Sequence, residues 1–140
     1  MYIPEIENKI EHLVKLYETR DPFKLAKALD IEVIFEDLGE IYGYCTRFRR
    51  IQSIHVNSIL DENKQRFTCA HELGHGILHP NENTPLLSKA SAVSELKIEK
   101  EANYFATNLL VDPNMDGIEY LTKYQKLECF GISDDFVRFL

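Results

Sequence analysis

The feature that most constrains this chain is the segment His-Glu-Leu-Gly-His at residues 71–75, inside a stretch that reads as helical. Successive residues of an α-helix turn by ~100°, so His71 and His75 lie on one face, one turn apart. Two imidazoles placed in this way can bind a single Zn²⁺ at ~2.0–2.1 Å each. Glu72 flanks that face, where its carboxylate can take a proton from a water on the metal.

The helix that carries this segment is predicted to lie in the protein interior. Apolar residues such as Phe67, Leu73 and Ile77 occur on nearly all of its sides, which is typical of a buried helix. Two histidines and a glutamate in such a helix require partners, because an unpaired polar group is costly to bury. A bound metal supplies those partners. The alternative is that both histidines are hydrogen-bonded residues of the core.

A third metal ligand is expected from a second long helix, predicted over residues 94–111. When this helix is projected at ~100° per residue, Glu99 falls in the middle of its apolar stripe. A carboxylate there is costly unless it is paired or bound to a metal. Glu99 is therefore the predicted third ligand. Glu95, one turn earlier, is the alternative, and Glu101 is expected on the solvent side.

Two further side chains are candidates for supporting roles. Asn103 lies one turn beyond Glu99, where it could hydrogen-bond the free ring nitrogen of a zinc-bound histidine; the alternative is a locally satisfied Asn. His79 is eight residues from His71, or ~12 Å along the helix, too far to share one ion through ~2 Å bonds. We expect His79 to cap the helix, where the dipole favours it, or to orient a group near the cleft.

The remaining pattern predicts an α+β fold in one domain, residues 1–140. Helical periodicity covers residues 5–19, a capped helix begins at Asp21-Pro22, and a last helix is expected over 117–128. Strands are predicted at 31–35, 42–48 and 51–56, forming a small antiparallel sheet of about three strands packed with helices.

Composition excludes several classes of protein. The chain has 16 Lys and Arg against 23 Asp and Glu, a net charge of −7, which argues against direct nucleic-acid binding. Residues 23–29 resemble the first helix of a helix-turn-helix, but a predicted strand follows instead of a recognition helix. No apolar run reaches the ~18 residues of a membrane span, and no signal peptide is expected. Three cysteines without a Cys-x-x-Cys spacing favour free thiols and a cytoplasmic location.

Residues 66–75 and 99–110 resemble the ImmA/IrrE family of gluzincin-like zinc metallopeptidases, found in bacteria, prophages and mobile elements. Residues 21–33 and 54–57 fit the same pattern. The resemblance implies a zincin-like pair of helices at the active site. It also implies zinc bound by His71, His75 and Glu99, with Glu72 as general base and Asn103 behind a histidine. Residues 111–113 depart from the Met-Pro that often follows Leu-Leu, and residues 114–140 correspond to a variable C-terminal helical segment.

The resemblance further implies an endopeptidase that cleaves a helix-turn-helix repressor and so relieves repression of a prophage or mobile element. The alternatives are a zinc-binding module that binds a repressor without cleaving it, and an acidic interaction protein whose motif is incidental. For the enzyme, the sheet could offer an edge to an extended substrate. The group that stabilises the oxyanion stays open among Tyr42, Tyr44, His55 and His79.

Overall fold

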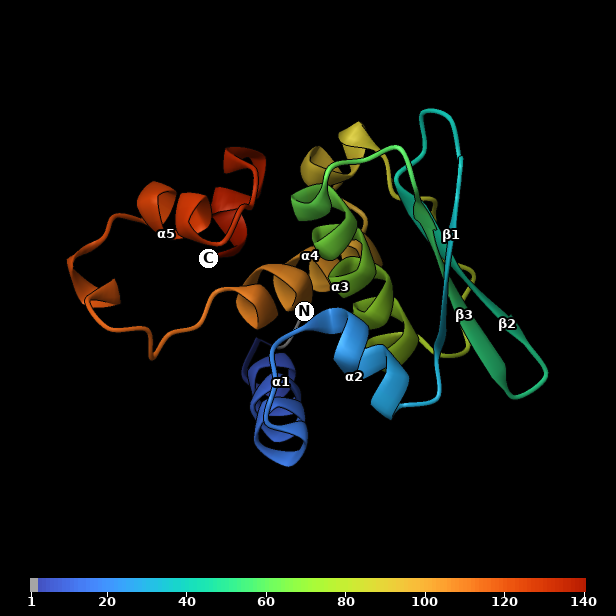
Figure 1. Ribbon diagram of the computed structural model, residues 1–140, viewed down its shortest axis with the longest axis horizontal. Coiled ribbons are helices and arrows are strands. Elements are labelled where there is room, and N and C mark those ends of the chain that lie inside the picture. Colours follow the sequence, from blue (N-terminus) through green and yellow to red (C-terminus); the bar gives the residue numbers. More distant parts are fainter. Residues whose placement is uncertain (1–2) are drawn as a thin grey trace.

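The computed structural model describes residues 3–140, so residues 1 and 2 of the predicted domain lie outside the described chain. A small sheet stands on one side, and helices cover one of its faces (Figure 1). The α+β prediction is confirmed. The elements are α1 Ile3–Tyr17, α2 Pro22–Ala28, β1 Glu32–Glu36, β2 Gly43–Phe48, β3 Ile51–Asn57, α3 Glu62–Leu78, α4 Lys97–Leu110 and α5 Lys123–Cys129, with 3₁₀ helices η1 Lys89–Val93, η2 Ile118–Tyr120 and η3 Asp134–Phe139.

Side-chain caps explain where several helices begin. Asp21 caps α2 by accepting a hydrogen bond from the main-chain N–H of Phe23, and Asp61 caps α3 in the same way. The helix predicted over residues 117–128 is interrupted, because Thr122 caps α5 through a capping box with Gln125. The extended backbone of Leu121 and Thr122 separates η2 from α5.

The sheet is mixed, which corrects the prediction of an antiparallel sheet. Its strand order is β1-β3-β2. The hairpin strands β2 and β3 pair antiparallel, as expected, but β1 pairs parallel to β3. β1 and β2 are consecutive in the sequence but are not neighbours in the sheet, because β3 lies between them. Alternation of side chains along a strand identifies its buried face but not its neighbour, so the sequence pattern does not reveal this arrangement.

The buried side chain of Asn57 holds the connection between β1 and β2. Its amide nitrogen donates to the carbonyl oxygens of Gly39 at 2.9 Å and Ile41 at 2.8 Å. Its Oδ1 accepts from the N–H of Leu38 at 3.2 Å. A loop lacks the regular main-chain hydrogen bonds of a helix or a sheet, so its main-chain groups need such partners. Asn57, at the end of β3, thereby fixes the path of the chain around the central strand.

The two long helices α3 and α4 pack closely at Gly74. A Cβ atom added at this glycine would lie 2.9 Å from Cδ1 of Phe105, whose side chain is fully buried. The missing side chain therefore lets α4 approach the face of α3 that carries the two histidines. Phe136 of η3 also packs on Phe67 of α3, with ring centroids 4.2 Å apart.

Among residues 3–140, no helix has both the length and the apolar character needed to cross a membrane.

This close approach predicts different outcomes at two glycines of α3. Gly74→Ala should lower the free energy of unfolding by about 1–3 kcal/mol, because the added methyl group meets a packed ring. Gly76→Ala is the matched control, since its new Cβ meets only the end of the Gln52 side chain, at 3.3 Å. It should be neutral or slightly stabilising, because Ala favours the helix. Denaturant unfolding of both variants checks this, and equal stabilities would contradict it.

Candidate metal centre

Three side chains from α3 and α4 meet in the interior. Nε2 of His75 lies 2.7 Å from Oε1 of Glu99, and Nε2 of His71 lies 3.4 Å from the same oxygen. One potential ligand atom from each residue falls within 4.8 Å of the others. All three residues are buried. The helix face predicted from the sequence therefore brings the two imidazoles and the carboxylate together in space.

The outer nitrogen of His71 is held by Asn103 of α4. Oδ1 of Asn103 lies 2.8 Å from Nδ1 of His71, and its amide nitrogen donates to the carbonyl oxygen of Ser91 at 3.0 Å. The second bond orients the amide, so Oδ1 faces the ring and Nδ1 of His71 is the donor. The lone pair of Nε2 is then left facing Glu99.

The outer nitrogen of His75 contacts His79 at the end of α3. The two Nδ1 atoms are 3.0 Å apart, and Nε2 of His79 lies 3.4 Å from Oε1 of Glu101. Glu101 thus departs from its expected place on the solvent side, because it turns toward the end of α3. Burial lowers the pKa of His79, and the nearby His75 lowers it further, although Glu101 acts in the opposite direction.

Glu72 is the buried acid with the fewest hydrogen bonds among the described residues. Its side chain is 0% exposed, and neither carboxylate oxygen has a hydrogen-bond partner among residues 3–140. Burial raises its pKa to about 8. For Glu99 burial acts in the same direction, but the two neighbouring histidines, His71 and His75, outweigh it and lower the pKa to about 2. The two carboxylates, although close in space, therefore have opposite proton affinities.

The residues present fit a divalent metal ion. Within the described part of the chain, Nε2 of His71 and Oε2 of Glu99 are buried without a hydrogen-bond partner. Both histidines present Nε2 toward the same carboxylate, while their outer nitrogens have partners. Two imidazoles and one carboxylate are a donor set typical of catalytic zinc sites, which keep a further position open. Such unsatisfied atoms are otherwise costly to bury.

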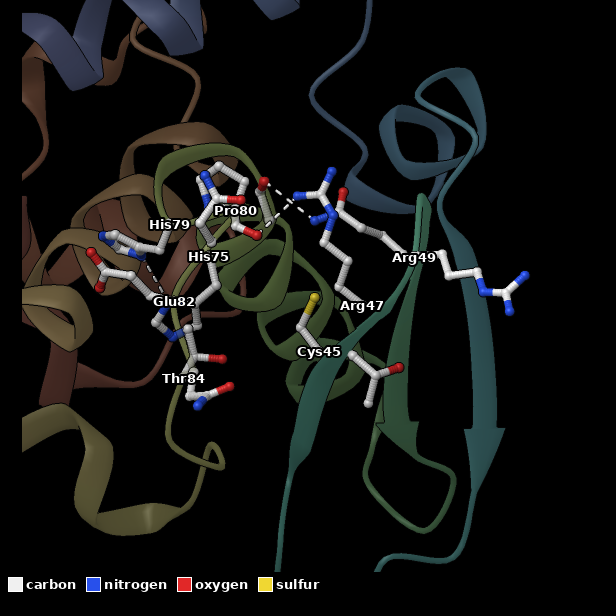
Figure 2. A pocket seen from close by; sticks show the side chains of 13 residues that line it. Cys45, Arg47, Arg49, His75, His79, Pro80, Glu82 and Thr84 are labelled. Atoms are coloured by element: carbon white, nitrogen blue, oxygen red, sulfur yellow. Dashed lines mark hydrogen bonds between the residues drawn. The ribbon is translucent and has the colours of Figure 1, made fainter.

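Several other candidates lie away from this cluster. Glu95 is on the surface, where it bonds Arg138 at 2.7 Å and Lys100 at 3.3 Å. Tyr44 and His55 stack on each other at 4.2 Å, and His55 also bonds Glu36 at 2.8 Å. Side chains alternate along β2, so Tyr44 points away from the face that presents Cys45 to α3 (Figure 2).

Tyr42 lies close to the N-terminal half of α3, where it lines a separate cavity together with Phe67. His79 stands behind His75, bonded to its outer nitrogen. Neither residue has a contact with Glu72, Glu99 or His71 among the side-chain hydrogen bonds found in residues 3–140. The hydrogen bonds of Tyr42 and His79 therefore do not place either residue as the oxyanion donor.

A polar pocket of about 520 Å³ opens beside the cluster. It lies between β2 and the C-terminal end of α3, and His75 and His79 form part of its wall (Figure 2). On the opposite wall is Cys45, whose pKa is raised to about 12 by burial and by the charge of Glu72. Arg47 reaches across and donates to the carbonyl oxygen of Pro80 at 2.9 Å. The pocket thus gives access to the buried histidines.

Sequence reasoning missed a contact at the edge of β2. Leu87, in the segment between α3 and η1, is fully buried and forms an isolated bridge with Gly43. Its N–H donates to the oxygen of Gly43 at 2.9 Å, and its oxygen accepts from the N–H of Tyr42 at 2.8 Å. The two adjacent leucines at 86–87 were the available signal.

Comparison with known proteins gives a consistent result. A family model for peptidase family M78, described as the IrrE N-terminal-like domain, matches residues 26–125. The chain is 40% identical over 107 residues to "Uncharacterized immunity region protein 2" of Bacillus phage phi105, covering 76% of this chain and 68% of that protein. It is 29% identical over 125 residues to "Metallopeptidase ImmA" of Bacillus subtilis strain 168, covering 86% of this chain and 73% of that protein.

Proposed function

Because the chain belongs to the IrrE N-terminal-like domain family of peptidases, we propose that it is a zinc-dependent endopeptidase. The observation that carries this proposal is the buried cluster of His71, His75 and Glu99, with the carboxylate of Glu72, which has no partner within residues 3–140, beside it. We propose the first three residues as the metal ligands and Glu72 as the catalytic base. Asn103 would orient His71 from outside the cluster.

The chemistry divides between the metal and the chain. A zinc ion at this position would supply Lewis acidity, lowering the pKa of a water to about 7 and polarising the peptide carbonyl. The carboxylate of Glu72 accepts the proton of the attacking water and later delivers it to the leaving amine nitrogen. Burial suits Glu72 to this role, because it raises the proton affinity of the carboxylate. The full burial of Glu72 keeps bulk water away from its carboxylate.

The free edge of β2 is the proposed binding site for an extended substrate. β2 is an outer strand of the sheet, and Leu87 occupies only its Gly43 end. Main-chain groups alternate in direction along an antiparallel strand, so those of Cys45 and Arg47 are expected to face the same way as Gly43. Both residues line the pocket beside His75. A substrate strand paired there would run past the metal ligands.

The proposed substrate is a helix-turn-helix repressor that controls a prophage or mobile element. One relative is named as a phage immunity region protein and another as a metallopeptidase, which supports a protease acting within an immunity system. The net charge of −7 favours contact with the repressor protein over contact with DNA. Because such a repressor acts on DNA inside the cell, we propose a cytoplasmic reaction.

A cleavage assay tests this function. The purified chain, loaded with zinc, should cut the repressor encoded next to it, and mass spectrometry of the fragments would locate one main cleavage site. Cleavage should stop in the presence of 1,10-phenanthroline and return when zinc is added in excess. The control substrate is an unrelated helix-turn-helix repressor of similar size, which should remain intact.

The same assay separates the enzyme from a regulatory module that only binds the repressor. Co-purification of the intact repressor, with no fragments after prolonged incubation with zinc, would contradict the proposed activity and favour the module. A zinc content well below one ion per chain after gentle purification would contradict the metal site itself.

A further inference from the structure

We propose that His79 and Glu101 are positioning residues for the metal site, with His79 accepting the Nδ1 proton of His75 and Glu101 accepting the Nε2 proton of His79. This inference rests on the proposed metal site and assigns two residues outside the ligand set. Among the hydrogen bonds found in residues 3–140, neither side chain bonds a predicted ligand atom of the cluster. Both act through His75.

With a metal on Nε2 of His75, the geometry determines which nitrogen carries each proton. The two Nδ1 atoms are 3.0 Å apart, so one must be protonated and the other must accept. Nε2 of His75 faces Glu99, and its lone pair has to stay available for a metal. The proton of His75 is therefore on Nδ1, and His79 is the acceptor. The remaining proton of His79 is then on Nε2, which faces Oε1 of Glu101 at 3.4 Å.

The two proposed histidine ligands are supported by different chemistry. Behind His71 stands the neutral amide of Asn103, which in turn donates to a main-chain carbonyl. Behind His75 stands an imidazole whose far nitrogen faces a carboxylate. A carboxylate bonded directly to a ligating histidine fixes the tautomer of the ring and increases the basicity of the ligand nitrogen, and here Glu101 acts on His75 through His79. We therefore expect His75 to be the stronger of the two imidazole ligands.

A purely structural role for His79 predicts a different pattern. His79 is the C-cap of α3, and the capping bond runs from its main-chain N–H to the carbonyl oxygen of His75 at 2.8 Å. This bond does not involve the imidazole, so it survives replacement of the side chain. Loss of the imidazole should therefore change metal binding much more than it changes the stability of the metal-free chain.

Three substitutions at residue 79 distinguish these roles. In His79→Asn the amide oxygen is two bonds from Cβ, like Nδ1 of His, so it can still accept from His75. In His79→Gln the oxygen is three bonds away, like Nε2. His79→Ala removes the acceptor. Glu101→Gln keeps an acceptor for His79 but removes the negative charge. His12→Ala is the matched control, because His12 is exposed on α1.

The measurement is zinc affinity, obtained by competition with a chromophoric chelator. His79→Ala should weaken zinc binding by about 10- to 100-fold, as expected when the partner of a ligating histidine is lost. His79→Asn should recover most of that loss, His79→Gln should recover little, and Glu101→Gln should be intermediate. His12→Ala should match the wild type. With Co²⁺, His79→Ala should also shift the visible absorption bands.

Histidine ¹⁵N NMR of the zinc-loaded wild type provides a test that needs no variant. It should show His75 protonated at Nδ1 and His79 protonated at Nε2. The opposite tautomer at His79, or equal zinc affinities for His79→Ala and the wild type, would overturn the positioning role while leaving the metal site intact. Failure of the wild-type chain to bind either zinc or cobalt would overturn the metal site as well.

Discussion

Glu72→Gln is expected to slow cleavage of the repressor by about 10²- to 10⁴-fold, the usual contribution of a general base, while zinc remains bound. The amide has the shape of the carboxylate but cannot accept the proton of the attacking water. Glu72 is fully buried, and its oxygens have no other partner within residues 3–140. Substituting it should therefore leave the neighbouring ligands in place.

Single-turnover cleavage measures this effect, with the zinc content of each sample determined by mass spectrometry. Glu62→Gln is the matched control, because Glu62 is an exposed acid in the first turn of the same helix. It should cleave at the wild-type rate. Undiminished cleavage by Glu72→Gln with a full complement of zinc would remove Glu72 from the role of base.

The same variant should change how the stability of the metal-free chain depends on pH. Burial raises the pKa of Glu72 to about 8, above the ~4.3 of a glutamate in an unfolded chain. Between these values the folded chain binds more protons than the unfolded chain, so this group makes stability fall as pH rises. Glu72→Gln should remove that contribution and be more stable than the wild type at pH 8. Such a gain in stability with a loss of activity is expected of a functional residue.

Zinc is expected to raise the melting temperature of the wild-type chain by roughly 10–15 °C. A ligand that binds only the folded state contributes about 4 kcal/mol at a concentration 1,000-fold above its Kd, and each kcal/mol corresponds to roughly 2–4 °C in a chain of about this length. The physical source is the cluster of His71, His75 and Glu99, in which two buried ligand atoms have no hydrogen-bond partner within residues 3–140.

Glu99→Gln should abolish this stabilisation, because a neutral amide is a poor replacement for a carboxylate ligand. Glu119→Gln, at an exposed position in η2, should keep the full shift. Thermal melts with and without zinc, and with zinc plus a chelator, measure the effect. A wild-type melting temperature that does not respond to zinc would contradict the metal site, and an unchanged shift in Glu99→Gln would contradict the choice of third ligand.

Much of the secondary structure was predictable, because its signals are local. The Asp caps of α2 and α3 mark helix starts in the sequence, and the hairpin β2–β3 follows from its alternating residues. The parallel pairing of β1 was not predictable, since it depends on the path that Asn57 imposes on the loop before β2. The bridge between Leu87 and Gly43 was missed for a similar reason. Its partners are distant in the sequence.

The sequence by itself determined which side chains share one face of a helix. His71 with His75, and Glu99 with Asn103, follow from the helical repeat of 3.6 residues, which depends only on the chain within a turn or two. The tertiary structure alone decided how the two faces meet. The space left by Gly74 lets α4 lie against α3, and in this packing Glu101 faces His79 instead of solvent. Contacts between helices depend on packing and relative rotation, which no local periodicity encodes.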